Sequence, residues 1–296
     1  MNVASSILST LAYHDIFDYP LDLHEIFDLL IKKKSDKESI ARGLERLRVA
    51  GKVSENNGCF FLKGRRKIVR VRKLRIKYSL KKLKRAAFFA KLLRIVPSVK
   101  LVAVSGALSM KNSRKSDDID LVIVTPKSLL WTTRLLANLL LLPFKRDPAG
   151  KKISDRACLN MFLDESALSI KDHNMYTAHE ICQMKLLWDR DNTYSKFIRA
   201  NSWIREYLPN WEADVKRLTT NDKRKKSPKA LDFRRFALVI EPLEALAKWG
   251  QLWYMRNKLT TERISNTQLF FHPKDTQSWV IAEYQKGLKK LNIADP

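Results

Sequence analysis

Apolar residues recur at helical spacing through about the first fifty residues of the chain. Residues 5–17 (SSILSTLAYHDIF), 21–31 (LDLHEIFDLLI) and about 35–50 each place apolar side chains on one face, which predicts three helices. A capping box of Ser35 and Glu38 marks the start of the third helix, and Gly51 marks its end. Two short strand-like runs then flank Asn57-Gly58, a dipeptide typical of tight hairpins.

Three helices followed by a hairpin resemble a winged helix-turn-helix domain, and the resemblance covers residues 1–62. In such a domain the third helix reads DNA, so that Arg42, Arg46 and Arg48 become the candidate contacts. Residues 1–62 also contain many acidic side chains, and winged helices also serve as protein-packing modules. The pattern therefore leaves both DNA reading and protein packing open.

The segment over residues 63–97 is strongly basic and is predicted to form one connecting helix. Sixteen Lys or Arg and no Asp or Glu lie between Lys63 and Lys100, in a chain of 296 residues with a formal net charge of +26. Apolar residues such as Leu74 recur at helical spacing along it, opposite a basic face. That face is either only solvated or attracts the phosphates of a nucleic acid or nucleotide, the usual partners of so basic a protein.

Two apolar strand-like runs flank a glycine turn near residue 106. The first run, residues 100–105, leads into Gly106, and the second contains Asp118 and Asp120 and continues to Thr125. Alternate residues of a strand share a face, so both carboxylates are expected to point the same way. Carboxylates that are so close repel each other, and a divalent cation relieves the repulsion. Mg²⁺ takes one or two carboxylates with substrate phosphate oxygens, and a glycine lets backbone amides approach a phosphate. The stretch predicts a Mg²⁺–triphosphate site; the alternative is an edge strand with solvated carboxylates.

The order strand, glycine turn, about ten residues and Asp-x-Asp on a second strand resembles the nucleotidyltransferase fold of the DNA polymerase beta superfamily over residues 98–165. The resemblance implies a mixed-sheet core in which Asp118 and Asp120 are the catalytic, metal-binding acids. It implies Mg²⁺ as the cofactor, a nucleoside triphosphate such as ATP as the substrate, and catalysis by positioning and charge neutralisation. The residues that would hold the triphosphate around the motif glycine are Ser105, Gly106, Ala107 and Ser109.

Two positions depart from the family's pattern. The serine that usually follows the motif glycine is Ala107 in this chain. The family often has a third acid on a later strand, and the aligned position in the strand expected over residues 157–165 is the neutral Asn160. Asp164, four residues further on and expected on the same face of the strand, is a candidate to replace the third acid. Because the third acid usually serves as the base for the attacking hydroxyl, its loss would weaken catalysis.

The apolar residues 128–144 predict a helix packed on the sheet, because the run is short for a membrane span and contains Arg134. The basic loop after it, with Lys145 and Arg146, either meets phosphates or is solvated. From Ser166 onward the periodicity is helical, which predicts a helical C-terminal domain over residues 166–296.

These patterns predict a mixed α/β (α+β) protein with a winged helix, a basic connecting helix, a nucleotidyltransferase mixed-sheet core and a helical C-terminal domain. The three cysteines fit no disulfide or metal spacing, which predicts reduced thiols in the cytoplasm. The expected function is Mg²⁺-dependent transfer of a nucleoside monophosphate from an NTP to an acceptor. The alternative is a weak or inactive member of the fold that acts as a nucleic-acid-binding regulator, with DNA or tRNA as the partner.

Overall fold

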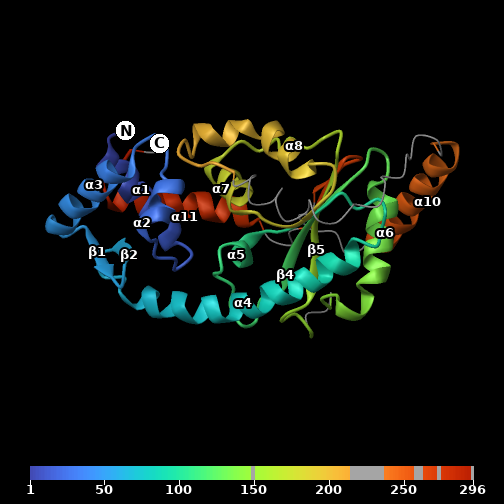
Figure 1. Cartoon of the computed structure of the whole chain (residues 1–296), viewed down its shortest axis with the longest axis horizontal. Coiled ribbons are helices and arrows are strands. Elements are labelled where there is room, and N and C mark those ends of the chain that lie inside the picture. The colour runs from blue at the N-terminus through green and yellow to red at the C-terminus, as the bar shows by residue number, and fades with distance from the viewer. Residues whose placement is uncertain (148–150, 214–236, 257–262, 272–274, 295–296) are drawn as a thin grey trace.

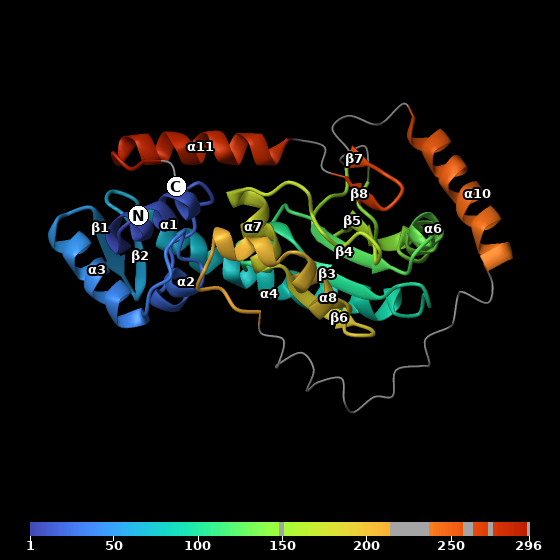
Figure 2. The ribbon, with the colours of Figure 1, turned by 90° about the horizontal axis from the view of Figure 1, so that it is seen from above.

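The computed structural model shows a mixed α/β protein built around one six-stranded sheet (Figures 1 and 2). It describes residues 1–147, 151–213, 237–256, 263–271 and 275–294. The strands lie in the order β6-β3-β4-β5-β8-β7; β4 and β5 are parallel, and the other neighbours are antiparallel. Their bounds are β3 (Leu101–Val104), β4 (Ile119–Thr125), β5 (Ala157–Asp164), β6 (Lys185–Asp189), β7 (Arg263–Ile264) and β8 (Gln268–Phe270).

The first part of the chain forms the expected order of three helices and a hairpin. The elements are α1 (Val3–Asp15), α2 (Leu23–Asp28), α3 (Lys37–Val49), β1 (Val53–Asn56) and β2 (Cys59–Leu62). Asn57 and Gly58 both have positive φ, 53° and 72°, which a two-residue hairpin turn requires. The expected cap of the third helix is wrong: Asp36, not Ser35, accepts the Ser39 N–H, because the helix starts one residue later.

The long basic helix is α4 (Lys67–Leu93), which joins this unit to the sheet (Figure 1). Its predicted apolar stripe is wrong in the first half, where Leu74 is 45% exposed. The inward face there is cationic instead, because it meets the acidic residues of the first unit. Arg72 pairs with Glu25 at 2.7 Å and Arg75 with Asp18 at 3.3 Å. Many of the acids of the first unit therefore neutralise one side of α4.

The two faces of the sheet pack against different helices. One face carries Val102, Leu121 and Ile123 and packs on the second half of α4 and on two further helices, α6 (Leu130–Leu140) and α10 (Ala237–Met255). The helix expected over residues 128–144 is confirmed as α6 followed by the short 3₁₀ helix η1 (Leu142–Phe144). No helix within the described ranges combines the length and the apolar character that a bilayer crossing requires.

The other face of the sheet, with Ala103, Val122 and Val124, belongs to a core that continues into the first unit. It packs on α7 (Met175–Gln183), α8 (Thr193–Ala200), the 3₁₀ helix η2 (Ser202–Glu206) and α11 (Thr276–Lys290). Helix α11 lies against α1, which brings the two ends of the described chain close together (Figure 2). One apolar core therefore links the first helices, the sheet and the last helix.

The expectation that the chain is helical from Ser166 onward is wrong for three segments. Residues 185–189, 263–264 and 268–270 form β6, β7 and β8 of the central sheet. The sequence KLLWD of β6 continues the helical spacing of apolar residues in α7. The hydrophobic pattern therefore does not mark the end of the helix or the start of the strand. Hydrogen bonding to the free edge of β3 decides its conformation.

A short helix and a pinned loop connect β3 to β4. Helix α5 (Gly106–Ser109) follows β3, and a loop then leads to Asp118. Lys82 of α4, 2% exposed, holds this loop: its ammonium donates to the carbonyls of Lys115 at 3.2 Å and Asp117 at 2.6 Å. It also pairs with the Asp155 carboxylate at 2.8 Å, so one buried cation ties the loop before β4 to the residues before β5.

Replacing Lys82 tests this anchor. Lys82→Met leaves two carbonyl groups without their donor, and we expect the free energy of unfolding in urea to fall by about 2–4 kcal/mol. Lys81→Met, at the exposed neighbouring position, is the matched control and should change it by less than about 0.5 kcal/mol. Equal effects of the two substitutions would show that Lys82 is no anchor.

Candidate metal centre

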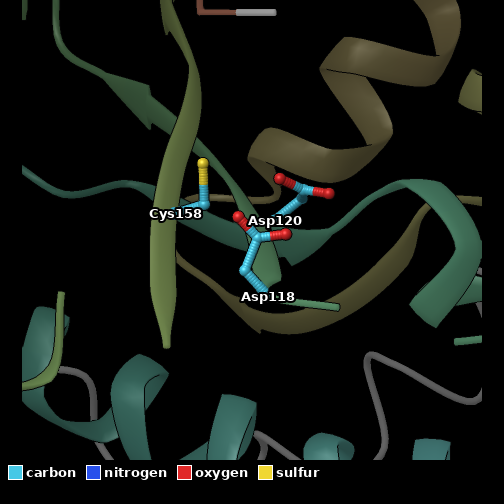
Figure 3. A group of neighbouring side chains, drawn as sticks. All are labelled: Asp118, Asp120 and Cys158. Atoms are coloured by element: carbon cyan, nitrogen blue, oxygen red, sulfur yellow. The ribbon is translucent and has the colours of Figure 1, made fainter. Parts of the chain in front are cut away.

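Asp118 and Asp120 lie at the start of β4 and point to the same side of the sheet (Figure 3). Cys158, from the neighbouring parallel strand β5, stands beside them because the register pairs it with Asp120. One ligand atom from each of the three residues lies within 4.8 Å of the others. The expected convergence of the two carboxylates is therefore present, with a thiol as the third group.

Gly106 brings the backbone close to this pair. Its φ is +62°, a conformation that side chains disfavour, and a Cβ added to it would lie 3.4 Å from Asp120 Oδ2. The preceding residue is also tied to the strand, because the Ser105 N–H donates to the Asp120 carbonyl at 3.2 Å. The glycine turn and the acid pair thus form one local unit, as the sequence pattern predicts.

The position expected for a third acid is wrong. Asn160 lies at an irregularity in the β4–β5 register, between the pairs Leu121–Leu159 and Val122–Met161, and Cys158 takes the place beside Asp120. Asp164 is not a substitute, because it pairs with Thr125 at the far end of the strands. Its carboxylate accepts the N–H groups of Ser128 at 2.8 Å and Ser166 at 2.7 Å, which is a structural role.

Burial and mutual repulsion set the protonation of the site. Burial, followed by the charge of Asp118, raises the pKa of Asp120 to about 7. Burial, followed by the charges of Asp120 and Asp118, holds the pKa of the Cys158 thiol well above its ordinary value. Cys158 therefore stays a neutral thiol near pH 7 and donates a hydrogen bond to Asp120.

Arg146 brings a positive side chain into contact with the acid pair. Its guanidinium lies 2.8 Å from Asp118 Oδ2, and its backbone N–H donates to the carbonyl of Ala157 at the start of β5. Arg146 comes from the basic loop that the sequence offered as a phosphate contact. Its neighbour Lys145 instead donates to Asn138 of α6.

A third carboxylate approaches from helix α7. Glu180 accepts a hydrogen bond from the Gly106 N–H, and burial raises its pKa to about 7 although that bond opposes the shift. Its charge in turn raises the pKa of Asp120. Sequence reasoning missed Glu180, because only the packing of α7 against the glycine turn brings it there.

The candidate phosphate-binding residues lie apart from one another. Ser105 is 4% exposed and lies on the same side as the acids, whereas Ala107 is exposed. The Ser109 hydroxyl donates to the Gly106 carbonyl at 2.7 Å and faces a separate hollow beside Arg72. Ser105 and Gly106 therefore belong to the site, and Ser109 does not face it.

The candidate DNA contacts on α3 are all exposed, but Arg48 is neutralised. Its guanidinium pairs with Glu45 at 3.0 Å and with Glu55 of β1 at 3.2 Å. Arg42 hydrogen-bonds to Ser39 within its own helix. Arg46 is thus the member of the set with no ion pair or hydrogen bond among the described side chains.

The donor set of the site fits Mg²⁺ through its oxygens. Two convergent carboxylates are what this ion takes from a protein, whereas a neutral thiol is a poor ligand for it. Asp118 and Asp120 would therefore hold the ion, and Cys158 would orient Asp120 by its hydrogen bond.

Comparison with known proteins assigns no family to the chain. A scan against protein-family models and a search of curated proteins both found no match. The geometry of the site is therefore the basis for assigning a function.

Asp120→Asn tests the electrostatic cost of the acid pair. Between about pH 4 and pH 7 the folded protein keeps a proton on Asp120 that the unfolded chain has lost, so this group lowers wild-type stability as the pH rises. We expect the asparagine variant to have a higher free energy of unfolding than the wild type at pH 8 in EDTA, by at most about 4 kcal/mol. Screening by solvent reduces this difference.

The difference in the free energy of unfolding between the variant and the wild type, measured in urea, should shrink as the pH falls through 7. It should nearly vanish at pH 4. Saturating Mg²⁺ should stabilise the wild type but not the variant. Asp191→Asn, at an exposed position away from the pair, is the control. A stability difference that does not depend on pH would contradict the assigned repulsion.

Proposed function

We propose that this protein is a Mg²⁺-dependent nucleotidyltransferase, which moves a nucleoside monophosphate from an NTP such as ATP to an acceptor. The observation that carries the proposal is the convergence of Asp118 and Asp120 beside the positive-φ Gly106. The three-helix and hairpin unit and the mixed sheet support the assignment to a winged helix and a nucleotidyltransferase core. Three free cysteines support a cytoplasmic setting.

In the proposed reaction an acceptor oxygen bonds to the α-phosphorus while the bond from that phosphorus to the pyrophosphate oxygen breaks. Pyrophosphate and a proton are released. Asp118 and Asp120 hold Mg²⁺, which neutralises the charge of the triphosphate. Arg146, already in contact with Asp118, supplies a guanidinium that can turn to a phosphate oxygen. The protein's contribution is mainly positioning and charge.

The proposal predicts Mg²⁺-dependent label transfer from a labelled NTP to one of a panel of acceptors: tRNA, DNA ends, protein and small alcohols. Asp118→Asn and Asp120→Asn should each lower the rate at least about a thousandfold, because each removes one of two charges that bind the ion. Asp191→Asn should stay within about threefold of the wild type. Transfer that survives both site substitutions would refute the proposal.

A second candidate is nucleic-acid binding without turnover, and the outer face of α4 favours it. This α4 basic face points to solvent and begins at Arg66, just before the helix. Its members recur every three or four residues from Arg66 to Lys84, and one lies two turns further on: Arg66, Arg70, Lys73, Lys77, Lys81, Lys84 and Lys91. None of them has an ion-pair partner within the described ranges. A helix of 27 residues is about 40 Å long, which matches about one turn of duplex. Glu180 at the Gly106 N–H and Cys158 in place of a third acid also suit a protein without turnover.

Salt-dependent binding tests this candidate. For a duplex of about 20 base pairs, replacing Lys73, Lys77, Lys81 and Lys84 by Glu should reduce the slope of log K against log salt by about 3–4. A control variant changes the net charge equally on α8 and α11, at Lys196, Arg199, Lys289 and Lys290. Equal losses in both variants would show a general charge effect and not a surface on α4.

A further inference from the structure

A pocket of about 200 Å³ opens beside the metal centre, between the sheet, α7 and the start of α11. Its inner end is formed by Ser105 at the end of β3 and by Glu180 of α7. Both residues also touch the metal-binding unit: the Ser105 N–H bonds to the Asp120 carbonyl, and Glu180 accepts the Gly106 N–H. The pocket therefore ends where the acid pair begins.

The inner end of the pocket carries polar groups that can form further hydrogen bonds. Ser105 is 4% exposed, and its hydroxyl makes no hydrogen bond within the described chain. Because this residue lines the pocket, its hydroxyl can hydrogen-bond to a ligand there. Tyr176 of α7 lines the same space, and its hydroxyl also has no hydrogen bond among the described residues. The carboxylate of Glu180 has capacity to accept a second donor besides Gly106.

Much of the remaining wall is apolar and partly aromatic, and polar residues such as Thr177 and Asp275 also line the pocket. The apolar part is formed by Met161 and Phe270 of the sheet, Ile181 and Met184 at the end of α7, and Phe197 of α8. Cavities of roughly 150 Å³ hold a benzene ring, so this pocket has room for a ring with a short substituent. Arg263, which also lines the pocket, pairs with Asp172, so its guanidinium is already occupied.

We propose that this pocket binds the acceptor of the transfer reaction, a small alcohol with a flat apolar body, whose hydroxyl donates to Glu180 and accepts from Ser105. The assignment rests on the proposed function, since it names the acceptor class of that reaction. It follows from the groups that line the pocket, which are an apolar wall and polar side chains able to hydrogen-bond to a ligand, and from the acid pair beside them. A hydroxyl at the inner end lies next to the unit that would hold the NTP.

The chemistry of the inner end favours a neutral hydroxyl over a phosphate. An anionic group there would meet Glu180 and, beyond it, Asp120 and Asp118, with Arg146 already paired to Asp118. A donor hydroxyl instead gains a charge-assisted hydrogen bond. Glu180 contacts the substrate directly in this account, and its carboxylate orients the hydroxyl.

Methyl NMR on the full chain without nucleotide or metal tests the pocket independently of turnover. We use ¹³C-methyl methionine labelling, 2-phenylethanol as the probe, and pH 8, where Glu180 is ionised. The methyl signals of Met161 and Met184 should shift with saturation, whereas Met255, in the core on the opposite face of the sheet, should not. Ethylbenzene, which lacks the hydroxyl, should bind about tenfold more weakly.

Glu180→Gln separates the hydroxyl contact from simple filling of the pocket. We expect the variant to lose about tenfold in affinity for 2-phenylethanol and to be unchanged for ethylbenzene. Unchanged melting and an unchanged Met255 signal report that it is folded. Ala41→Gln, on the exposed side of α3, is the control.

Three results would overturn the assignment: no saturable shift at Met161 and Met184, equal affinity for both probes with no effect of Glu180→Gln, or adenosine binding there more tightly than the alcohol. A failed transfer assay alongside the expected shifts would reject the transferase and keep the alcohol site. Transfer activity without the methyl shifts would support the transferase and reject the alcohol site.

Discussion

The mutual repulsion of Asp118 and Asp120 is the constraint around which the centre of this protein is arranged. The chain holds two carboxylates on one side of a strand and partly out of water, where burial, followed by the charge of Asp118, raises the pKa of Asp120 to about 7. A fold that only had to be stable would separate them. A divalent cation between the two carboxylates would relieve this cost, which fits the metal-binding role that we propose for the site.

The surrounding structure prevents the pair from relaxing. Ile119, Leu121 and Ile123 are fully buried on the opposite face of β4, so the strand cannot rotate to release the acids. Parallel pairing with β5 fixes the register, and Lys82 fixes the loop before Asp118. Arg146 offsets part of the charge without removing it, since Asp118 is its one partner in the pair. Most of this restraint comes from apolar packing and backbone bonds.

Local sequence patterns predict much of the fold and of the site. The features that they do not predict share a physical cause. The acid pair, the glycine turn, the hairpin at Asn57-Gly58 and the helix after β4 depend on neighbours in the sequence, and all could be predicted. Cys158 could not, because an irregularity at Asn160 shifts the β5 register after residue 159 and no local signal marks it. Glu180 and the strand β6 depend on contacts that only the folded sheet creates.

Helix α7 makes the site depend on the first unit of the chain. His179, next to Glu180, stacks on Tyr13 of α1 with ring centroids 3.9 Å apart, and its Nδ1 bonds to the Met175 carbonyl. Burial holds the pKa of His179 well below its ordinary value, so this contact is between neutral rings over the physiological range. The same helix that aims Glu180 at the glycine turn is thus seated on α1. Whatever the three-helix unit binds, its packing also sets the position of α7, so the first unit and the metal centre are parts of one mechanical structure.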